Sequence, residues 1–184
     1  MFDGAIFSVQ RGVFDPVRHL SGMVFARWLA DQDFSEQRVL EVGTGCGLLA
    51  YAVAQSAAQV VATDVDSKAA ACAQGNLSDT NIDVRTGDLF EPVVAEHFDL
   101  LVVNPPYEIG WSLRPTFRSP NFLFRLALEW ENVADMMLLS FPTDSVDVLT
   151  SAGFDLRLEH RLATTGRELG VFRGVHGPSP IPRS

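Results

Sequence analysis

Short apolar runs alternate with helix-length segments through the middle of the chain, and this alternation restricts the fold more than any other feature of the sequence. In chain order the predicted elements are strand 38–42, helix 48–57, strand 59–64, helix 67–77, strand 82–88 and strand 98–104. Strands that alternate with helices are typical of parallel strands joined by crossover helices. The sequence therefore predicts an α/β fold with a doubly wound, mostly parallel sheet.

The last third of the chain predicts an antiparallel hairpin at the end of this sheet. The predicted elements there are helix 120–131, strand 134–140, helix 143–151 with Thr143 as a candidate N-cap, strand 154–163 and strand 168–175. In strand 154–163, apolar residues at 156, 158 and 162 alternate with charged ones, as in a strand with one buried face. The sequence "TTG" at 164–166 supplies the turn, and an amphipathic helix is expected at 20–31.

Composition limits the class of protein. The chain of 184 residues is expected to form one domain over 1–176, followed by a disordered tail at 177–184. Its net charge of −9 disfavours a nucleic-acid partner, because such binding usually depends on a basic surface. No apolar run approaches the ~20 residues that span a bilayer. Two cysteines without a secretory signal predict a cytoplasmic protein with free thiols.

Glycines and an acid occupy the turn between the first predicted strand and its helix. The stretch "EVGTGCG" contains Glu41, Gly43, Thr44, Gly45 and Gly47. Glycines at such a turn let the backbone approach a ligand and leave helix N-terminal amides pointing at it. The spacing is G-x-G-x-G, whereas a dinucleotide fingerprint would need glycine at Leu48, so a ligand without a pyrophosphate is favoured. A turn that serves packing alone is the alternative.

Acids also stand at the ends of the next two strands. Asp64, followed by Val65, is placed where a carboxylate can accept hydrogen bonds from two ribose hydroxyls. Asp88 is placed to accept a bond from an adenine amine, with Leu89 and Phe90 covering the ring. Each acid alone is equally well explained as a helix cap. In order at consecutive strand ends, the two acids predict a ligand that contains a nucleoside.

The fourth strand ends in the sequence Asn104, Pro105, Pro106 and Tyr107. The prolines fix φ and supply no competing N–H, so a carboxamide and a phenol ring are held rigidly at the end of a buried strand. A plain strand-end turn is the alternative.

The order of these motifs resembles the class I S-adenosylmethionine-dependent methyltransferases. It is most similar to the branch with an N-P-P-Y corner, which includes release-factor glutamine methyltransferases and methyltransferases for the exocyclic amines of adenine or guanine. The resemblance implies a Rossmann-like, seven-stranded sheet, S-adenosyl-L-methionine as cofactor, and an arm and helix at 1–31 that cover the cofactor site. It implies cofactor contacts for Glu41, Gly43, Thr44, Gly45, Gly47, Asp64, Val65, Asp88, Leu89 and Asn104.

The same resemblance implies a catalytic role for Asn104, Pro105, Pro106 and Tyr107. The Asn104 oxygen and the Pro105 carbonyl would accept hydrogen bonds from the acceptor nitrogen, and the Tyr107 ring would stack on its plane and favour developing positive charge. Methyl transfer needs the nucleophile in line with the S–CH3 bond, so positioning can supply most of the acceleration. No metal is expected, because the four histidines have no ligand spacing.

The expected activity is N-methylation of a planar or amide-like nitrogen in a protein side chain or a small metabolite. A nucleobase methyltransferase and a non-catalytic cofactor-binding subunit are the alternatives, and a homodimer or a small activating subunit remains open. The expected substrate-binding residues are Phe14, Trp111, Arg114, Phe117 and Arg118, with Arg125 as a further anion contact. The arm departs from its relatives in having Arg18 and His19 where they carry acids.

Overall fold

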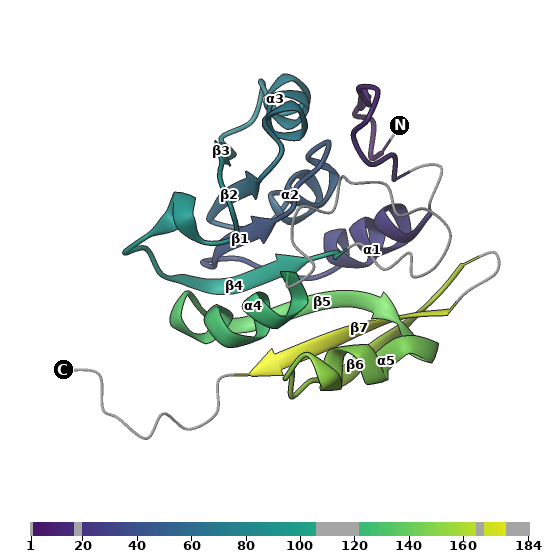
Figure 1. Ribbon diagram of the computed structural model, residues 1–184. Helices are drawn as coiled ribbons and strands as arrows, with labels where there is room; N and C mark the ends of the chain where they lie inside the picture. The colour runs from purple at the N-terminus through teal and green to yellow at the C-terminus, as the bar shows by residue number, and fades with distance from the viewer. Residues whose placement is uncertain (1, 17–19, 106–121, 165–167, 176–184) are drawn as a thin grey trace.

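The fold is built on one mixed sheet, in a computed structural model that describes residues 2–16, 20–105, 122–164 and 168–175. Within these ranges seven strands pair in the order β3-β2-β1-β4-β5-β7-β6 (Figure 1). The strands are β1 (Arg38–Val42), β2 (Gln59–Asp64), β3 (Asp83–Thr86), β4 (Phe98–Val103), β5 (Ala134–Pro142), β6 (Arg157–Ala163) and β7 (Glu168–Val175). Strands β1 to β5 are parallel, and β7 is antiparallel to β5 and β6. The predicted doubly wound sheet with a C-terminal hairpin is confirmed.

Helices cover both faces of the sheet (Figure 1). The first face is covered by α1 (Ser21–Ala30), α2 (Leu48–Val53) and α3 (Ser67–Asn76). The second face is covered by the short 3-10 helix η1 (Glu91–Val93), by α4 (Phe122–Glu129) and by α5 (Val146–Ser151). Two further 3-10 helices, η2 (Trp130–Asn132) and η3 (Thr143–Ser145), flank β5.

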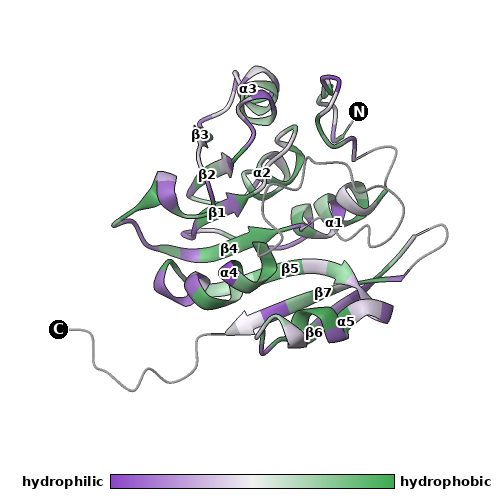
Figure 2. Cartoon of the chain, viewed as in Figure 1, coloured by the Kyte–Doolittle hydropathy of each residue, from purple (hydrophilic) through white to green (hydrophobic). Residues whose placement is uncertain are grey.

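The central strands are apolar on both sides because both faces are covered. In β4, Leu100 and Val102 belong to the core of the first face, and Leu101 and Val103 belong to the core of the second. All four side chains are 0% exposed. Figure 2 shows the same pattern, with β4 and β5 mostly in the hydrophobic colour. The continuous run "LLVV" is therefore a strand buried on both faces, and its carboxyl end lies inside the molecule.

Most of the predicted boundaries agree with the structure. The strands β1, β2 and β7 begin and end at the predicted residues. Helix α2 ends at Val53, four residues earlier than predicted. There the Ser56 hydroxyl accepts a hydrogen bond from the Phe34 N–H and donates one to the Gln32 carbonyl, so contacts with the segment that follows α1 hold the chain in a turn.

Two predictions about the C-terminal part are wrong. Thr143 does not cap α5, because it begins η3 and its hydroxyl lies 3.0 Å from the Glu168 carboxylate. The apolar residues of β6 do not share one face. The pairing with β7 shifts between Leu158 and His160, so Leu158 packs in the core of the second face and Leu162 in that of the first. A β-bulge adds one unpaired residue and thereby exchanges the two sides of the strand.

Two further predictions lie at least partly outside the described residues, namely the turn at 164–166 and the tail at 177–184. Of the helices in the described ranges, none combines the length and the apolar character needed to cross a membrane.

Candidate active site

The loop after β1 has a backbone shape that glycine adopts most easily. Gly43, Gly45 and Gly47 have φ angles of 79°, 59° and 88°, in the left-handed region where a side chain is strained. A Cβ at Gly47 would also lie 2.7 Å from the Cδ1 atom of Leu77. A Cβ at Gly43 or Gly45 would instead meet no atom of the described residues within 4 Å. The loop therefore packs closely at its helical end and leaves open space beside its first two glycines.

The end of β2 holds this loop in place. The Thr63 carbonyl accepts hydrogen bonds from the Gly43 and Thr44 N–H groups, at 2.8 and 2.9 Å. The Asp64 carboxylate accepts one from the Gly45 N–H at 2.9 Å and another from the Asp66 N–H at 2.9 Å. Burial raises the pKa of Asp64. The acid predicted to bind a ribose thus also fixes the glycine loop, and each of its oxygens keeps a further lone pair.

Glu41 is a buried carboxyl that ties the loop to α2. One of its oxygens accepts hydrogen bonds from the Thr44 hydroxyl at 2.6 Å and from the Ala50 N–H at 3.0 Å. Ala50 lies in the first turn of α2, where N–H groups have no partner within the helix. Burial raises the pKa of Glu41 to about 7, and the two hydrogen bonds oppose the rise.

Asn76 connects the loop to the N-terminal arm, a contact that the sequence did not reveal. Its amide nitrogen donates to the carbonyls of Ser8, at 2.8 Å, and Cys46, at 2.9 Å, while its oxygen accepts from the Ser8 N–H at 2.9 Å. The arm also packs on α2, where the rings of Phe7 and Tyr51 meet edge to face with centroids 5.4 Å apart. The arm and the glycine loop are therefore held as one unit.

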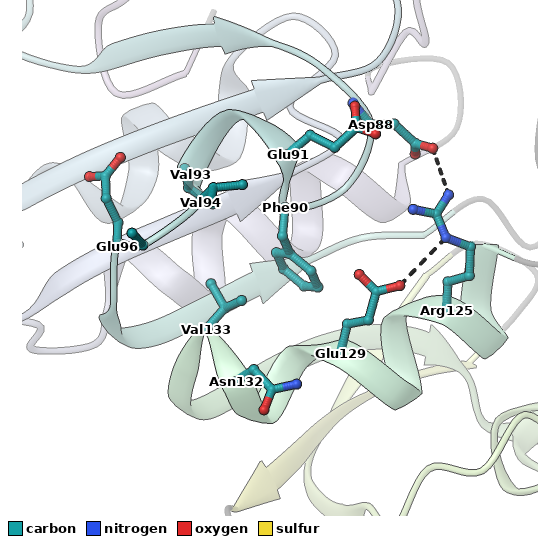
Figure 3. Close-up of a pocket in the computed structure, with 11 residues that line it drawn as sticks. Asp88, Phe90, Glu91, Val93, Val94, Glu96, Arg125, Glu129, Asn132 and Val133 are labelled. Carbon is teal, nitrogen blue, oxygen red and sulfur yellow. Dashed lines mark hydrogen bonds and ion pairs between the residues drawn. The ribbon is translucent and has the colours of Figure 1, made fainter. Parts of the chain in front are cut away.

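The remaining predicted cofactor contacts differ in accessibility. Val65 is 57% exposed just after β2, whereas Leu89 is only 3% exposed and packs in the core of the second face. The Asp88 carboxylate accepts a hydrogen bond of 2.6 Å from the Arg125 guanidinium. Figure 3 shows Arg125 extending from α4 between Asp88 and Glu129. Arg125 thus has carboxylate partners within the protein, in place of the ligand anion that the sequence predicted.

A groove of about 340 Å³ runs from Asp88 between η1 and α4 (Figure 3). Its acids are largely paired, because Arg125 contacts Asp88 and Glu129 and the Glu96 carboxylate pairs with Arg38 and Arg85. The groove therefore offers little uncompensated charge to a ligand.

The corner after β4 begins with Asn104, a half-buried residue. The side-chain oxygen of Asn104 is shielded from solvent and has no hydrogen-bond partner in the part of the chain that the structure describes. Pro105 beside it is buried. An unpaired buried acceptor costs free energy, and a ligand that supplies a donor recovers it. Pro106 and Tyr107 lie outside the described residues.

The structure describes only one of the predicted substrate-binding residues, Phe14, which is 45% exposed. Trp111, Arg114, Phe117 and Arg118 lie outside the described residues, as do Arg18 and His19. No cluster of three or more histidine, cysteine or acidic side chains in the described ranges has a geometry that could hold a metal.

The two thiols are buried, and burial raises the pKa of Cys46 to about 12. A thiol with so high a pKa is a poor nucleophile, which fits the prediction that Cys46 fills space in the loop.

Sequence reasoning missed two polar residues that hold the loop, Thr63 and Asn76. A hydroxyl in the apolar strand "QVVATD" was the available signal for Thr63, which is 1% exposed and hydrogen-bonds the Glu41 carbonyl at 3.3 Å. Asn76 gave no comparable signal, because a polar residue near the end of a helix is ordinary.

A seven-stranded sheet of this order, with a glycine loop after β1 and acids after β2 and β3, defines the class I methyltransferase fold. Solved structures agree. The ribosomal protein L11 methylase of Lactobacillus delbrueckii superposes with a TM-score of 0.67 over 95% of this chain and 88% of that one, at 19% identity. The T. thermophilus 16S rRNA N2 G1207 methyltransferase, solved with AdoMet and guanosine, gives 0.61 over 90% of this chain and 44% of that one, at 20% identity.

The chain belongs to the methyltransferase small-domain family, whose profile matches residues 6–118. A relative from Methanocaldococcus jannaschii, provisionally named a protein N5-glutamine methyltransferase, is 38% identical over 162 residues, covering 76% of this chain and 82% of that protein. The release factor glutamine methyltransferase of Xylella fastidiosa is 44% identical over 78 residues, covering 40% of this chain. The chain spans only 28% of the length of that bacterial relative.

Proposed function

We propose that the protein is an S-adenosylmethionine-dependent N-methyltransferase that acts on the side-chain amide of glutamine in a protein. The observation that carries the proposal is the buried oxygen of Asn104 at the end of β4, which has no hydrogen-bond partner among the described residues. An amide nitrogen is a donor that can satisfy it. The names of the relatives support glutamine as the residue modified.

The residues around the glycine loop fit the proposed cofactor. Open space lies beside Gly43 and Gly45, the Asp64 carboxylate has lone pairs left for hydroxyl groups, and Val65 presents an exposed apolar surface. At the end of β3, one Asp88 oxygen accepts a hydrogen bond from Arg125, and the carboxylate keeps lone pairs for an adenine amine. When bound, the cofactor supplies a methyl group on a positively charged sulfur.

The residues that follow β4, Asn104 and Pro105, bind the amide that receives the methyl group. The lone pair of an amide nitrogen is delocalised into the carbonyl, so the nitrogen is a weak nucleophile. Hydrogen bonds from its N–H groups to the Asn104 oxygen and the Pro105 carbonyl hold the amide plane and draw the nitrogen towards tetrahedral geometry. Positioning of this kind can provide a large part of the rate acceleration. After transfer the nitrogen is acidic and gives its proton to water, so no general base is needed before transfer.

Methylation of a nucleobase amine is the second candidate function. The solved rRNA methyltransferase with a similar fold supports it, since that protein modifies a guanine nitrogen. The acids Asp64, Asp66 and Asp88 at the carboxyl ends of β2 and β3 disfavour a polyphosphate beside the site.

Cofactor binding is tested first, by calorimetry with S-adenosylmethionine and with NAD. We expect the protein to bind S-adenosylmethionine and not NAD. The opposite preference would contradict the proposed cofactor.

The acceptor is tested by transfer of a labelled methyl group to glutamine-containing peptides, to total RNA and to DNA. Label in the peptide at the glutamine side chain is expected, and label in nucleic acid alone would establish the second candidate. Asn104→Ala is expected to bind the cofactor and lose transfer, while Asn104→Asp keeps an acceptor and retains more activity. Asn81→Ala is the control, because Asn81 is an exposed residue that precedes the edge strand β3, whereas Asn104 follows the central strand β4.

A further inference from the structure

Two side-chain oxygens, one just after β4 and one near the carboxyl end of β5, are buried without a hydrogen-bond partner from the residues that the structure describes. The Asn104 amide oxygen and the Ser140 hydroxyl are both shielded from solvent, and neither has a hydrogen-bond partner within the described ranges. Ser140 is 0% exposed. Leaving such groups unpaired is costly, and the great majority of buried polar groups in proteins are paired.

The strand register places the two residues side by side. Strands β4 and β5 are parallel, and Val103 pairs with Leu139, so the residues that follow, Asn104 and Ser140, are neighbours across the same step of the sheet. Parallel strands lie ~4.8 Å apart.

The two side chains also point to the same face. Val102 and Leu138 both belong to the core of the first face. Side chains alternate along a strand, so Ser140 faces the same way as Leu138, and the same alternation carried one residue past the end of β4 places Asn104 on that face.

The chemistry of the pair is complementary to a primary amide. The Asn104 oxygen can only accept a hydrogen bond, whereas the Ser140 hydroxyl can donate one. A glutamine side chain presents N–H donors and a carbonyl acceptor on one rigid plane. We propose that Ser140 binds the substrate. Its hydroxyl donates a hydrogen bond to the carbonyl oxygen of the target amide, while the Asn104 oxygen accepts one from the N–H of that amide. This inference rests on the proposed function and extends it to a residue that determines specificity for an amide.

Three other hydroxyls of the described residues, those of Thr44, Thr63 and Ser56, behave differently. The Thr44 hydroxyl donates to Glu41, and the Thr63 hydroxyl bonds the Glu41 carbonyl. The partly buried Ser56 hydroxyl bonds both Phe34 and Gln32. These hydroxyls join segments of the fold, and Ser140 joins none of the described ones. A hydroxyl group in such a position is better explained by a ligand than by the stability of the folded chain.

The test compares Ser140→Ala, Ser140→Thr and the control Ser56→Ala in the full chain. The unfolding midpoint, the Kd for S-adenosylmethionine and the kcat/KM for a glutamine peptide are measured for each variant. Ser140→Ala is expected to be as stable as the wild type or more stable, because it removes an unpaired buried hydroxyl. It should bind the cofactor normally and lose about tenfold in kcat/KM. Ser140→Thr, which keeps a hydroxyl, should recover part of that loss.

The control separates this role from general destabilisation. Ser56→Ala removes two internal hydrogen bonds and should lower the unfolding midpoint while leaving kcat/KM unchanged. If Ser140→Ala keeps the wild-type kcat/KM, or if it unfolds more easily than the wild type, the inference is overturned while the proposed function stands. If the wild type methylates no glutamine peptide, the proposed function fails and this inference fails with it.

Discussion

Replacement of Glu41 by glutamine is expected to remove most of the pH dependence of stability in the weakly acidic range. Burial raises the pKa of Glu41 from 4.5 to about 7. The folded protein therefore binds a proton that the unfolded chain has released across this interval. For a raised pKa, the stabilisation is complete below the unfolded value and is lost as the pH rises through the folded value. A shift of this size corresponds to about 3 kcal/mol of unfolding free energy.

Glutamine retains the two contacts and removes the charge. Its side-chain oxygen can accept from both the Thr44 hydroxyl and the Ala50 N–H, as the carboxylate does. Near pH 8 the variant Glu41→Gln should therefore be more stable than the wild type by up to about 3 kcal/mol. At low pH, where Glu41 is neutral, the two proteins should be similar. Glu41→Ala lacks the acceptor and should be less stable than Glu41→Gln at every pH.

The assay is urea unfolding of the ligand-free proteins from about pH 5.5 to about pH 8.5. Burial also raises the pKa of Asp64, so this carboxyl contributes a pH dependence of the same sign in both proteins. Stability curves of the wild type and Glu41→Gln that run parallel across this range would refute the argument, because they would show that the Glu41 carboxyl has no raised pKa.

Two further predictions concern the loop and the Arg125 contact. Gly47→Ala should lower the unfolding free energy, measured in urea, by about 2 kcal/mol or more, because strain at positive φ is added to a clash with Leu77. Gly43→Ala has positive φ but open space, and should lower it by only about 1 kcal/mol. Equal losses in the two variants would contradict the packing argument. Arg125→Met should change the unfolding free energy by less than about 1 kcal/mol, because the ion pair between Arg125 and Asp88 is about one third exposed to solvent. A larger loss of stability that does not depend on salt concentration would show that solvent does not screen this pair.

The sheet could be predicted because its signals are local. Strands such as β2 are apolar runs whose bounds are marked by polar residues, and burial on both faces makes such runs continuous. The bulge in β6 could not be predicted, since an extra residue in one strand depends on how the partner strand pairs with it. The N-cap at Thr143 failed for a similar reason, because Glu168 from a distant strand takes the hydroxyl.

The site was predicted as a set of strand-end positions, and its internal contacts were not. Glu41 and Asp64 stand where the pattern puts them, but the bonds that they make to the loop follow from the folded geometry. Ser140 carries no motif, and its significance appears only when β5 is placed beside β4. Asp88 was predicted without its partner Arg125, because 37 residues separate the two along the chain.

The pairing of Asn76 with Ser8 has a consequence for how the sequence can vary. Ser8 takes part through its backbone N–H and carbonyl, whereas Asn76 uses its side chain. Any residue with a backbone N–H can stand at position 8, and proline is the one excluded. At position 76 a carboxamide of this length is required. The Asn76 side chain therefore joins the arm directly to the glycine loop, while the Cys72 thiol on the Ser8 carbonyl and the Phe7 ring on Tyr51 add contacts to the helices behind it.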